Sequence, residues 1–301
     1  MLDVNPEDSV AETQRLGASP TTQSARVGRR RARSNQSVRS SAVTAGDTPP
    51  VIRLGPFTVF AGTAADLTKT VVISALQALG IEAWIVFALH VGGLNAAKDL
   101  QFVEAMDNAD LVYADGVSVV ALARLAGNAG IQRAATTDIG WLVIAGMAAG
   151  LGRPVRLALV GGSPGLAERA AAVLKKKCAA EVVSCEHGYH SQWGEVLERV
   201  RAARPDIVLV GLGAPQEMKW VHANRVELPA ALILTCGGWF GFIAGDEHRA
   251  PLSLQRLGLE WLYRLVSNPG RLGRRYLRGA VVAGKLAVHV LVARVLSRLH
   301  S

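Results

Sequence analysis

The stretch Val155-Arg-Leu-Ala-Leu-Val-Gly-Gly-Ser-Pro-Gly165 decides the fold, because it joins a short apolar strand to a glycine turn that opens a helix. The stretch Pro205-Asp-Ile-Val-Leu-Val-Gly-Leu-Gly-Ala-Pro215 repeats this arrangement further along the chain. Strands that alternate with helices are typical of parallel βαβ units, in which ligands bind beyond the carboxyl ends of the strands. Glycine turns at helix starts expose backbone N–H groups that suit a diphosphate. A third glycine turn is Thr235-Cys-Gly-Gly238. Such turns either bind a ligand or are purely structural; for binding, the candidate residues are Gly161, Gly162, Gly213 and Gly238.

The same alternation extends in both directions from these two stretches. The expected strands are Phe57–Ala61, Trp84–Leu89, Leu111–Ala114, Val155–Val160, Glu181–Cys185, Ile207–Leu212 and Leu232–Cys236. The expected helices lie near 66–79, 98–108, 117–126, 138–149, 165–177, 192–203 and 216–226. We predict an α/β, Rossmann-like fold: a mostly parallel sheet with helices on both faces.

The two ends of the chain differ from this central part. Residues 1–50 are rich in Ser, Thr, Ala and Arg without an apolar period, which predicts a disordered basic arm, either a solvated tail or an anion-binding tether. Residues 249–301 carry ten Lys and Arg against one acid, and so hold the whole formal net charge of +9. We expect an Arg-rich helical appendage on a core of residues 51–248. It lies at an anionic membrane surface, or packs on the core with its arginines in water; both interpretations stay open.

Composition excludes several classes of protein. Half of the 301 residues are apolar and 19% are charged, which excludes a wholly disordered or fibrous chain. The three cysteines have no CxxC spacing, so we expect neither a disulfide framework nor a zinc site. This cysteine usage indicates a protein of the reducing cytoplasm. Apolar runs of about 18 residues, as a membrane-spanning helix needs, are absent from the sequence. The polar and acidic first residues of the sequence also argue against a cleavable signal peptide.

Two loop-to-helix junctions carry candidate catalytic residues. Asp115 follows the strand Leu111–Ala114 and precedes Gly116, so it is either a general base aimed into the cleft or the N-cap of the next helix. Arg133 and Asp138 bracket a threonine pair, where Asp138 could cap a helix and Arg133 could pair with it or with a phosphate. The histidines show no metal-binding spacing, so we predict no metal cofactor.

Three motif matches fail on physical grounds. The sequence Gly161-Gly-Ser163-Pro-Gly165 reads as a hydrolase G-x-S-x-G, but Pro164 lacks the N–H that the oxyanion hole requires. In this turn Ser163 is instead a candidate N-cap, with Pro164 at the first helical position. None of the glycine turns reads G-x-G-x-x-G, which argues against a dinucleotide oxidoreductase. The P-loop-like run from Gly279 to Lys285 lacks the Ser or Thr that would bind magnesium.

Taken together, several motifs resemble the bacterial WecG/TagA/CpsF glycosyltransferases, also called glycosyltransferase family 26, over roughly residues 55–278. They are Tyr113-Ala-Asp-Gly-Val-Ser-Val-Val120, Arg133 with Asp138, Leu159-Val-Gly-Gly-Ser-Pro-Gly165, Gly188-Tyr189, Pro205 to Pro215, Gly237-Gly-Trp-Phe240, and Arg249-Ala-Pro251 followed by Leu257-Gly-Leu-Glu-Trp-Leu-Tyr-Arg-Leu265. The last string is the most specific of them.

The resemblance implies an inverting transfer of a sugar, N-acetylmannosamine, glucose or a related sugar, from a UDP-sugar to a polyprenyl-diphosphate-linked acceptor. It implies a peripheral enzyme at the cytoplasmic face of the bacterial membrane, in cell-wall or exopolysaccharide synthesis, with UDP-sugar as substrate and no cofactor. Asp115 matches the catalytic base, and arginines would stabilise the departing UDP. The matching catalytic and binding positions are Arg133, Asn95, Asp138, Tyr189, Gln216, Glu217, Arg264, Arg271 and Arg274.

The sequence departs from the family pattern at three places. Gly93 stands where the family often has Thr, and Gly241 stands where it has Asp. The string Ala214-Pro-Gln-Glu-Met218 replaces Ala-Pro-Lys-Gln-Glu, so the family's Gln is either Gln216, shifted by one, or replaced by Glu217. The donor sugar, the acceptor glycan and the oligomeric state, a homo-oligomer included, stay open. The alternative function is a basic membrane- or nucleic-acid-binding α/β module without transferase activity.

Overall fold

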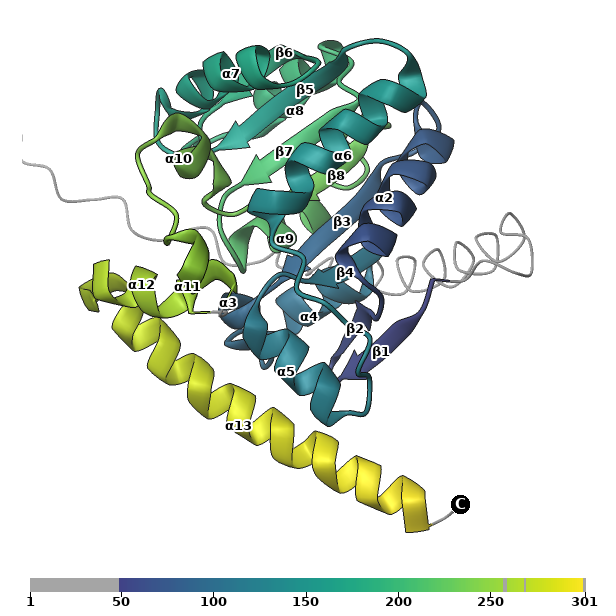
Figure 1. Ribbon diagram of the computed structural model, residues 1–301. Helices are drawn as coiled ribbons and strands as arrows, with labels where there is room; N and C mark the ends of the chain where they lie inside the picture. The colour runs from purple at the N-terminus through teal and green to yellow at the C-terminus, as the bar shows by residue number, and fades with distance from the viewer. Residues whose placement is uncertain (1–48, 257–258, 268, 300–301) are drawn as a thin grey trace, which may run out of the picture. The chain divides into compact units, whose positions relative to one another are not determined.

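Six parallel strands form the sheet at the centre of the fold (Figure 1). They are β3 (Trp84–Leu89), β4 (Leu111–Ala114), β5 (Val155–Gly161), β6 (Ala180–Glu186), β7 (Ile207–Gly211) and β8 (Leu232–Thr235). Their order across the sheet is β4-β3-β8-β7-β5-β6. The computed structural model describes residues 49–256, 259–267 and 269–299. The predicted α/β fold is confirmed, and each of these six strands lies within one residue of its predicted bounds at either end.

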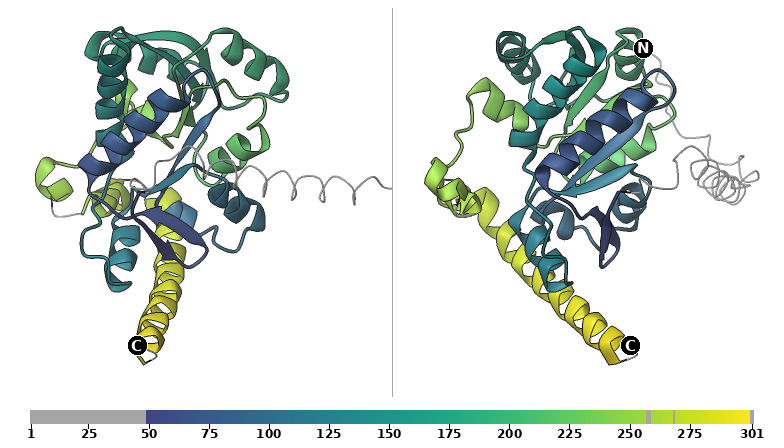
Figure 2. Two further views of the ribbon diagram at one scale, coloured as in Figure 1. Left: turned by 90° about the vertical axis from the view of Figure 1, so that its right-hand side faces the viewer. Right: turned by 45° about the vertical axis from the view of Figure 1, so that its right-hand side comes forward.

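Helices cover both faces of this sheet (Figures 1 and 2). One face is covered by α2 (Ala64–Ala78), α6 (Thr136–Leu151), α7 (Leu166–Lys177) and α10 (Trp239–Ala244). The other face is covered by α4 (Leu100–Asp107), α5 (Val117–Leu125), α8 (Gly194–Ala202) and α9 (Gln216–Ala223). Two short antiparallel strands, β1 (Val51–Leu54) and β2 (Phe57–Phe60), form a separate ribbon. The predicted arm of residues 1–50 lies outside the described residues, apart from its last two.

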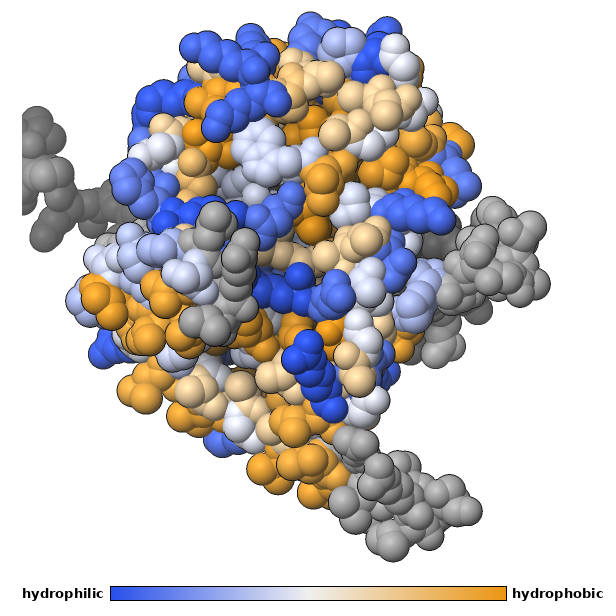
Figure 3. Space-filling model, in the orientation of Figure 1, coloured by the Kyte–Doolittle hydropathy of each residue, from blue (hydrophilic) through white to orange (hydrophobic). Residues whose placement is uncertain are grey.

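The C-terminal segment forms three helices, α11 (Leu252–Arg256), α12 (Glu260–Ser267) and α13 (Pro269–Leu299). Pro269 opens α13, because proline suits the first position of a helix, where its missing N–H leaves no bond unmade. The helix α13 packs against α5 and against the short helix α3 (Val91–Leu94). Hydrophobic side chains of α12 and α13 stay exposed along one edge of the surface (Figure 3). In the described part of the chain, no helix is both long and apolar enough to cross a membrane.

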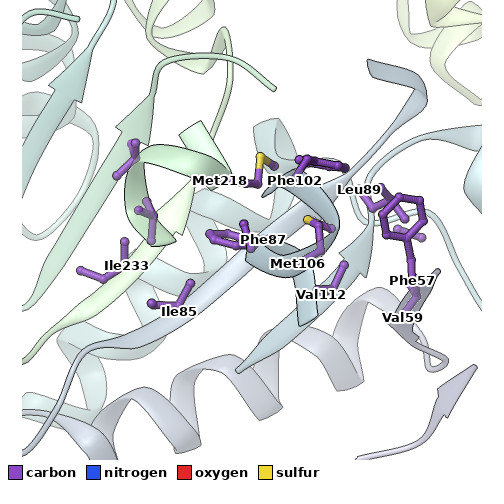
Figure 4. Close-up of a cluster of buried hydrophobic side chains, with 14 of the residues drawn as sticks. Phe57, Val59, Ile85, Phe87, Leu89, Phe102, Met106, Val112, Met218 and Ile233 are labelled. Atoms are coloured by element: carbon purple, nitrogen blue, oxygen red, sulfur yellow. The ribbon is translucent and has the colours of Figure 1, made fainter. Parts of the chain in front are cut away.

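Each face of the sheet has its own apolar core, because successive side chains of a strand point to opposite faces. On the face of α4 and α9, Ile85, Phe87 and Ile233 from the strands contact Met106 and Met218 from the helices (Figure 4). The alternate strand residues belong to the second cluster, under α2, α6 and α7. Burial on both faces explains why the strands read as continuous apolar runs in the sequence.

The connections that leave the neighbouring strands β5 and β7 run in opposite directions across the sheet, because β6 lies on one side of this pair and β8 on the other. Such a switch point creates a crevice at the carboxyl ends of the strands. Gly161 ends β5 with φ of 138°, and a Cβ there would collide with the backbone of Gly211 at the end of β7. The predicted N-cap at Ser163 is wrong: the N-cap is Gly165, two residues later, and no side chain caps α7. The glycine turns therefore bring the two strand ends together at the crevice.

Candidate functional site

A cavity of about 530 Å³ opens at the carboxyl ends of the strands. Its walls come from the ends of β3, β4, β7 and β8, from the start of α6, and from α12 and α13. The residues used below are His90, Val91, Asp115, Arg133, Thr136, Gly213, Glu217, Cys236, Gly237, Gly238, Glu260, Trp261, Tyr276 and Ala280. A cavity of this size suits a small-molecule ligand, and it lies where ligands bind in open α/β sheets.

Asp115 enters this cavity directly from the end of β4. Its backbone N–H donates to the Leu89 carbonyl at 3.0 Å, which fixes it to the neighbouring strand. Its Oδ2 accepts a hydrogen bond of 3.2 Å from the Thr136 hydroxyl, which lies 2.6 Å from the phenol oxygen of Tyr113. The N-cap of α5 is Gly116, and no side chain caps this helix. The interpretation of Asp115 as a helix cap is therefore wrong, and its half-buried carboxylate is held at the cavity instead.

Arg133 joins the end of β4 to the C-terminal helices. Its Nε donates to the Asp115 carbonyl at 3.0 Å, and its Nη2 donates to Glu260 of α12 at 2.8 Å. Arg249 extends this network, since its Nε lies 3.6 Å from the other oxygen of Glu260 and its remaining nitrogens donate to Asp138 at 2.5 and 3.2 Å. Of the two alternatives for Arg133, the pairing with Asp138 is therefore wrong, and the pairing with a phosphate stays a prediction. The N-cap role of Asp138 is also wrong, because α6 begins behind Ala135 without a side-chain cap.

Glu217 is the most deeply buried carboxyl group of the cavity, with 1% of its surface exposed. Its Oε2 accepts hydrogen bonds from the backbone N–H of Gly213, at 3.0 Å, and of Gly237, at 3.1 Å. Burial is the main cause that raises the pKa of Glu217 to about 7; the charge of Asp115 adds to this rise, and hydrogen bonds from backbone N–H groups oppose it. Glu217 is thus protonated in a large share of molecules at neutral pH.

The family model for the glycosyl transferase WecG/TagA/CpsF family matches residues 56–296. The chain belongs to this family. Members of the WecG/TagA/CpsF family are glycosyltransferases of cell-wall polymer synthesis, so the family match implies glycosyltransferase activity for this chain. The match covers the sheet, the cavity and most of α13.

The site of this WecG/TagA/CpsF chain gathers only part of the residues expected from the sequence. Asp115, Arg133, Gly213, Glu217 and Gly238 line the cavity. The described lining does not include Asn95, Asp138, Gly161, Gly162, Tyr189, Gln216 or Arg274. Among these, Gln216 and Arg274 are exposed to solvent, on α9 and α13 respectively. The side chains of Arg264 and Arg271 lie outside the described set.

Several lining residues were missed by the sequence analysis, above all Glu260, Trp261 and Tyr276 from the C-terminal helices. The rings of Trp261 and Tyr276 meet edge to face, with centroids 6.0 Å apart. The isolation of Glu260, the one acid among the ten Lys and Arg of residues 249–301, was the available signal. An acid in so basic a segment indicates a specific partner, and here its partners are Arg133 and Arg249. In the part of the chain that the structure describes, no three His, Cys, Asp or Glu side chains gather as a metal site would need.

Proposed function

We propose that the chain is an inverting glycosyltransferase that moves a sugar from a UDP-sugar to a polyprenyl-diphosphate-linked acceptor, without a metal cofactor. N-Acetylmannosamine, glucose and related hexoses are the candidate donor sugars. The observation that carries the proposal is the Asp115 carboxylate, held by Thr136 in a cavity at the carboxyl ends of the sheet. A fixed carboxylate that lines a cavity of ligand size is what a general base requires.

In the proposed reaction, the acceptor hydroxyl oxygen attacks the anomeric carbon of the donor sugar. The bond from this carbon to the UDP oxygen breaks, and UDP leaves with the electron pair. Asp115 accepts the proton of the attacking hydroxyl. Attack on the face opposite to the leaving group inverts the configuration at the anomeric carbon. The hydrogen bond from Thr136 holds the carboxylate in place for this step.

The negative charge that develops on UDP needs cationic partners, and guanidinium groups bind phosphates through two parallel hydrogen bonds. Arg133 lines the cavity and is the nearest candidate. We propose that Arg264, Arg271 and Arg274 also bind the diphosphate. In support, their helices α12 and α13 already contribute Glu260, Trp261 and Tyr276 to the cavity wall.

We further propose that α13 lies on the inner face of the cell membrane, where a polyprenyl acceptor is anchored. Apolar Leu277, Val281 and Val288 are exposed on this helix, 72%, 54% and 60% respectively. Arg274, Arg278 and Lys285 are exposed at spacings that put them beside these residues. An apolar stripe flanked by basic side chains is typical of a helix that lies at an anionic membrane surface.

The test combines a panel of UDP-sugars with a synthetic lipid-diphosphate-GlcNAc acceptor; the mass of the product identifies the transferred sugar, and NMR gives its anomeric configuration. We expect one donor to give a product with inverted linkage, and Asp115→Asn to lower the rate by about 10²–10⁴-fold. Asp107→Asn, which changes an exposed aspartate on α4, is the matched control and keeps the wild-type rate. UDP should raise the melting temperature of both variants, since Asp115 acts on the acceptor. A wild-type protein that turns over no donor, or an Asp115→Asn variant at full rate, would contradict the proposal.

A further inference from the structure

Glu217 is a buried carboxyl group that the proposed reaction does not use. It lies at the start of α9, yet its hydrogen bonds reach two different turns: Gly213 follows β7, and Gly237 follows β8. Both bonds end on the same atom, Oε2, so a single oxygen joins the two turns. Both turns line the cavity that holds Asp115. Any movement of Glu217 would therefore change two parts of the cavity wall together.

A glycine stands in each turn at the residue whose N–H donates to Glu217. Gly213 and Gly237 adopt φ values of 79° and 53°, a region that glycine enters without strain. A Cβ added to either residue would meet no atom within 4 Å, so neighbouring side chains do not pack over these glycines. The hydrogen bonds to Glu217 are thus the contacts that fix the direction of the two N–H groups.

We propose that Glu217 is a positioning residue for sugar transfer: its carboxyl group joins the turns after β7 and β8 and so fixes the cavity wall against which the donor binds. This inference rests on the proposed function, because it assigns the cavity to a sugar donor. It also places Glu217 behind the backbone of the wall rather than on the donor itself. The donor would touch the turns, and Glu217 would act through them.

The charge of Glu217 also acts on the reaction. Three titratable groups face it: Asp115 and Tyr113 from β4 and its end, and Cys236 from the end of β8. Burial raises the pKa of both Tyr113 and Cys236 well above the usual range, so these two stay neutral near pH 7. The remaining charged neighbour is Asp115, and two carboxylates in one cavity disfavour each other's ionisation.

Two variants separate the hydrogen bonds of Glu217 from its charge. Glu217→Gln keeps an oxygen that accepts from Gly213 and Gly237 but removes the charge. We expect its KM for the donor to stay within about twofold of wild type, while the change in rate near pH 7 that the ionisation of Glu217 causes in the wild type disappears from its pH–rate profile. Glu217→Ala loses both bonds, and we expect its KM to rise by about tenfold or more. Glu198→Gln, at an exposed position on α8, is the control and changes neither quantity.

Two further measurements do not need activity. Amide hydrogen exchange at Gly213 and Gly237 should become faster in Glu217→Ala and stay slow in Glu217→Gln. A raised carboxyl pKa stabilises the fold below that pKa and costs stability as pH rises through about 7, so Glu217→Gln should gain melting temperature over wild type between pH 5 and pH 8. If only the proposed function is wrong, the wild type will not transfer sugar, but the hydrogen-exchange and melting-temperature results will still hold. Unchanged exchange in Glu217→Ala, or unchanged KM and pH profile in both variants of an active enzyme, would overturn the inference.

Discussion

At the scale of single residues, the side chains of Tyr113, Thr136 and Asp115 form a chain of two hydrogen bonds at the cavity. The Thr136 hydroxyl has one proton and donates it to Asp115, so the Tyr113 phenol must donate to Thr136. Burial and the nearby Asp115 charge raise the pKa of Tyr113 well above its usual range, which keeps the phenol proton in place for this bond. The orientation of the candidate base thus depends on a buried tyrosine that never reaches the substrate.

Breaking this chain of hydrogen bonds at Thr136 should lower both the free energy of unfolding and the turnover rate. Thr136→Val leaves the buried Tyr113 hydroxyl without its described partner, and we expect a loss of about 1–3 kcal/mol in unfolding free energy. The double variant Tyr113→Phe/Thr136→Val removes both hydroxyls and should recover most of this loss, while its turnover stays low because Asp115 remains unsupported. Urea unfolding and the donor assay measure the two effects. Equal stability of the single and double variants would argue against this chain of hydrogen bonds.

The sequence predicts some of the side chains at the site, but it does not predict which of them contact each other. Asp115 was predictable because a carboxylate between a strand end and a glycine must emerge at the sheet edge. The bond between Arg133 and Glu260 was not, because it joins residues 127 positions apart, and only the docking of α12 brings them together. For the same reason Asp138 could not be assigned to Arg249 rather than to the nearby Arg133.

At the scale of elements, local chemistry explains which ones were predictable. The six strands of the central sheet were predicted almost to the residue because apolar β-branched runs end at glycine turns, whereas β1 was missed. Two short helices were missed: α3 reads Val-Gly-Gly-Leu and α10 reads Trp-Phe-Gly-Phe-Ile-Ala, both poor in helix-forming residues. Burial explains them, since Leu94 of α3 and Trp239 of α10 are inside the two cores. Tertiary packing outweighs weak propensity in both cases.

The contact between α13 and α3 offers a prediction at this scale. A Cβ at Gly279 would collide with Val91, whose branched side chain has few ways to yield, whereas a Cβ at Gly284 of the same helix would meet nothing within 4 Å. Gly284→Ala should stabilise the fold by up to about 1 kcal/mol through helix propensity. Gly279→Ala should be about 1–3 kcal/mol less stable than Gly284→Ala and should bind UDP more weakly, because Val91 also lines the cavity. Thermal unfolding with and without UDP measures both effects, and equal stability of the two variants would refute the close contact.

At the scale of the whole described molecule, charge and apolar surface converge on α13. The sequence places the formal net charge of +9 within residues 249–301, but it leaves open whether these residues face water, the core or a membrane. The fold divides the helix: Gly279, Val282 and Leu286 face the core, while Leu277, Val281, Arg278 and Lys285 are exposed. The helix thus packs one face against the core and leaves the other exposed. In the proposed function, this exposed face contacts the anionic membrane surface at which the acceptor is anchored.

Binding to vesicles tests this division of α13. Val281→Glu puts a charge in the exposed apolar stripe, and we expect binding to vesicles that contain anionic lipid to weaken by about tenfold or more, since apolar contact is lost and repulsion is added. The matched control is Val226→Glu, which adds the same charge at a valine that is 96% exposed elsewhere on the surface and should leave binding unchanged. Flotation with the full chain measures binding, and higher salt should weaken it in the wild type because part of the attraction is electrostatic. Equal flotation of the two variants would mean that α13 does not contact the bilayer through this stripe, and the acceptor would then have to reach Asp115 by another face.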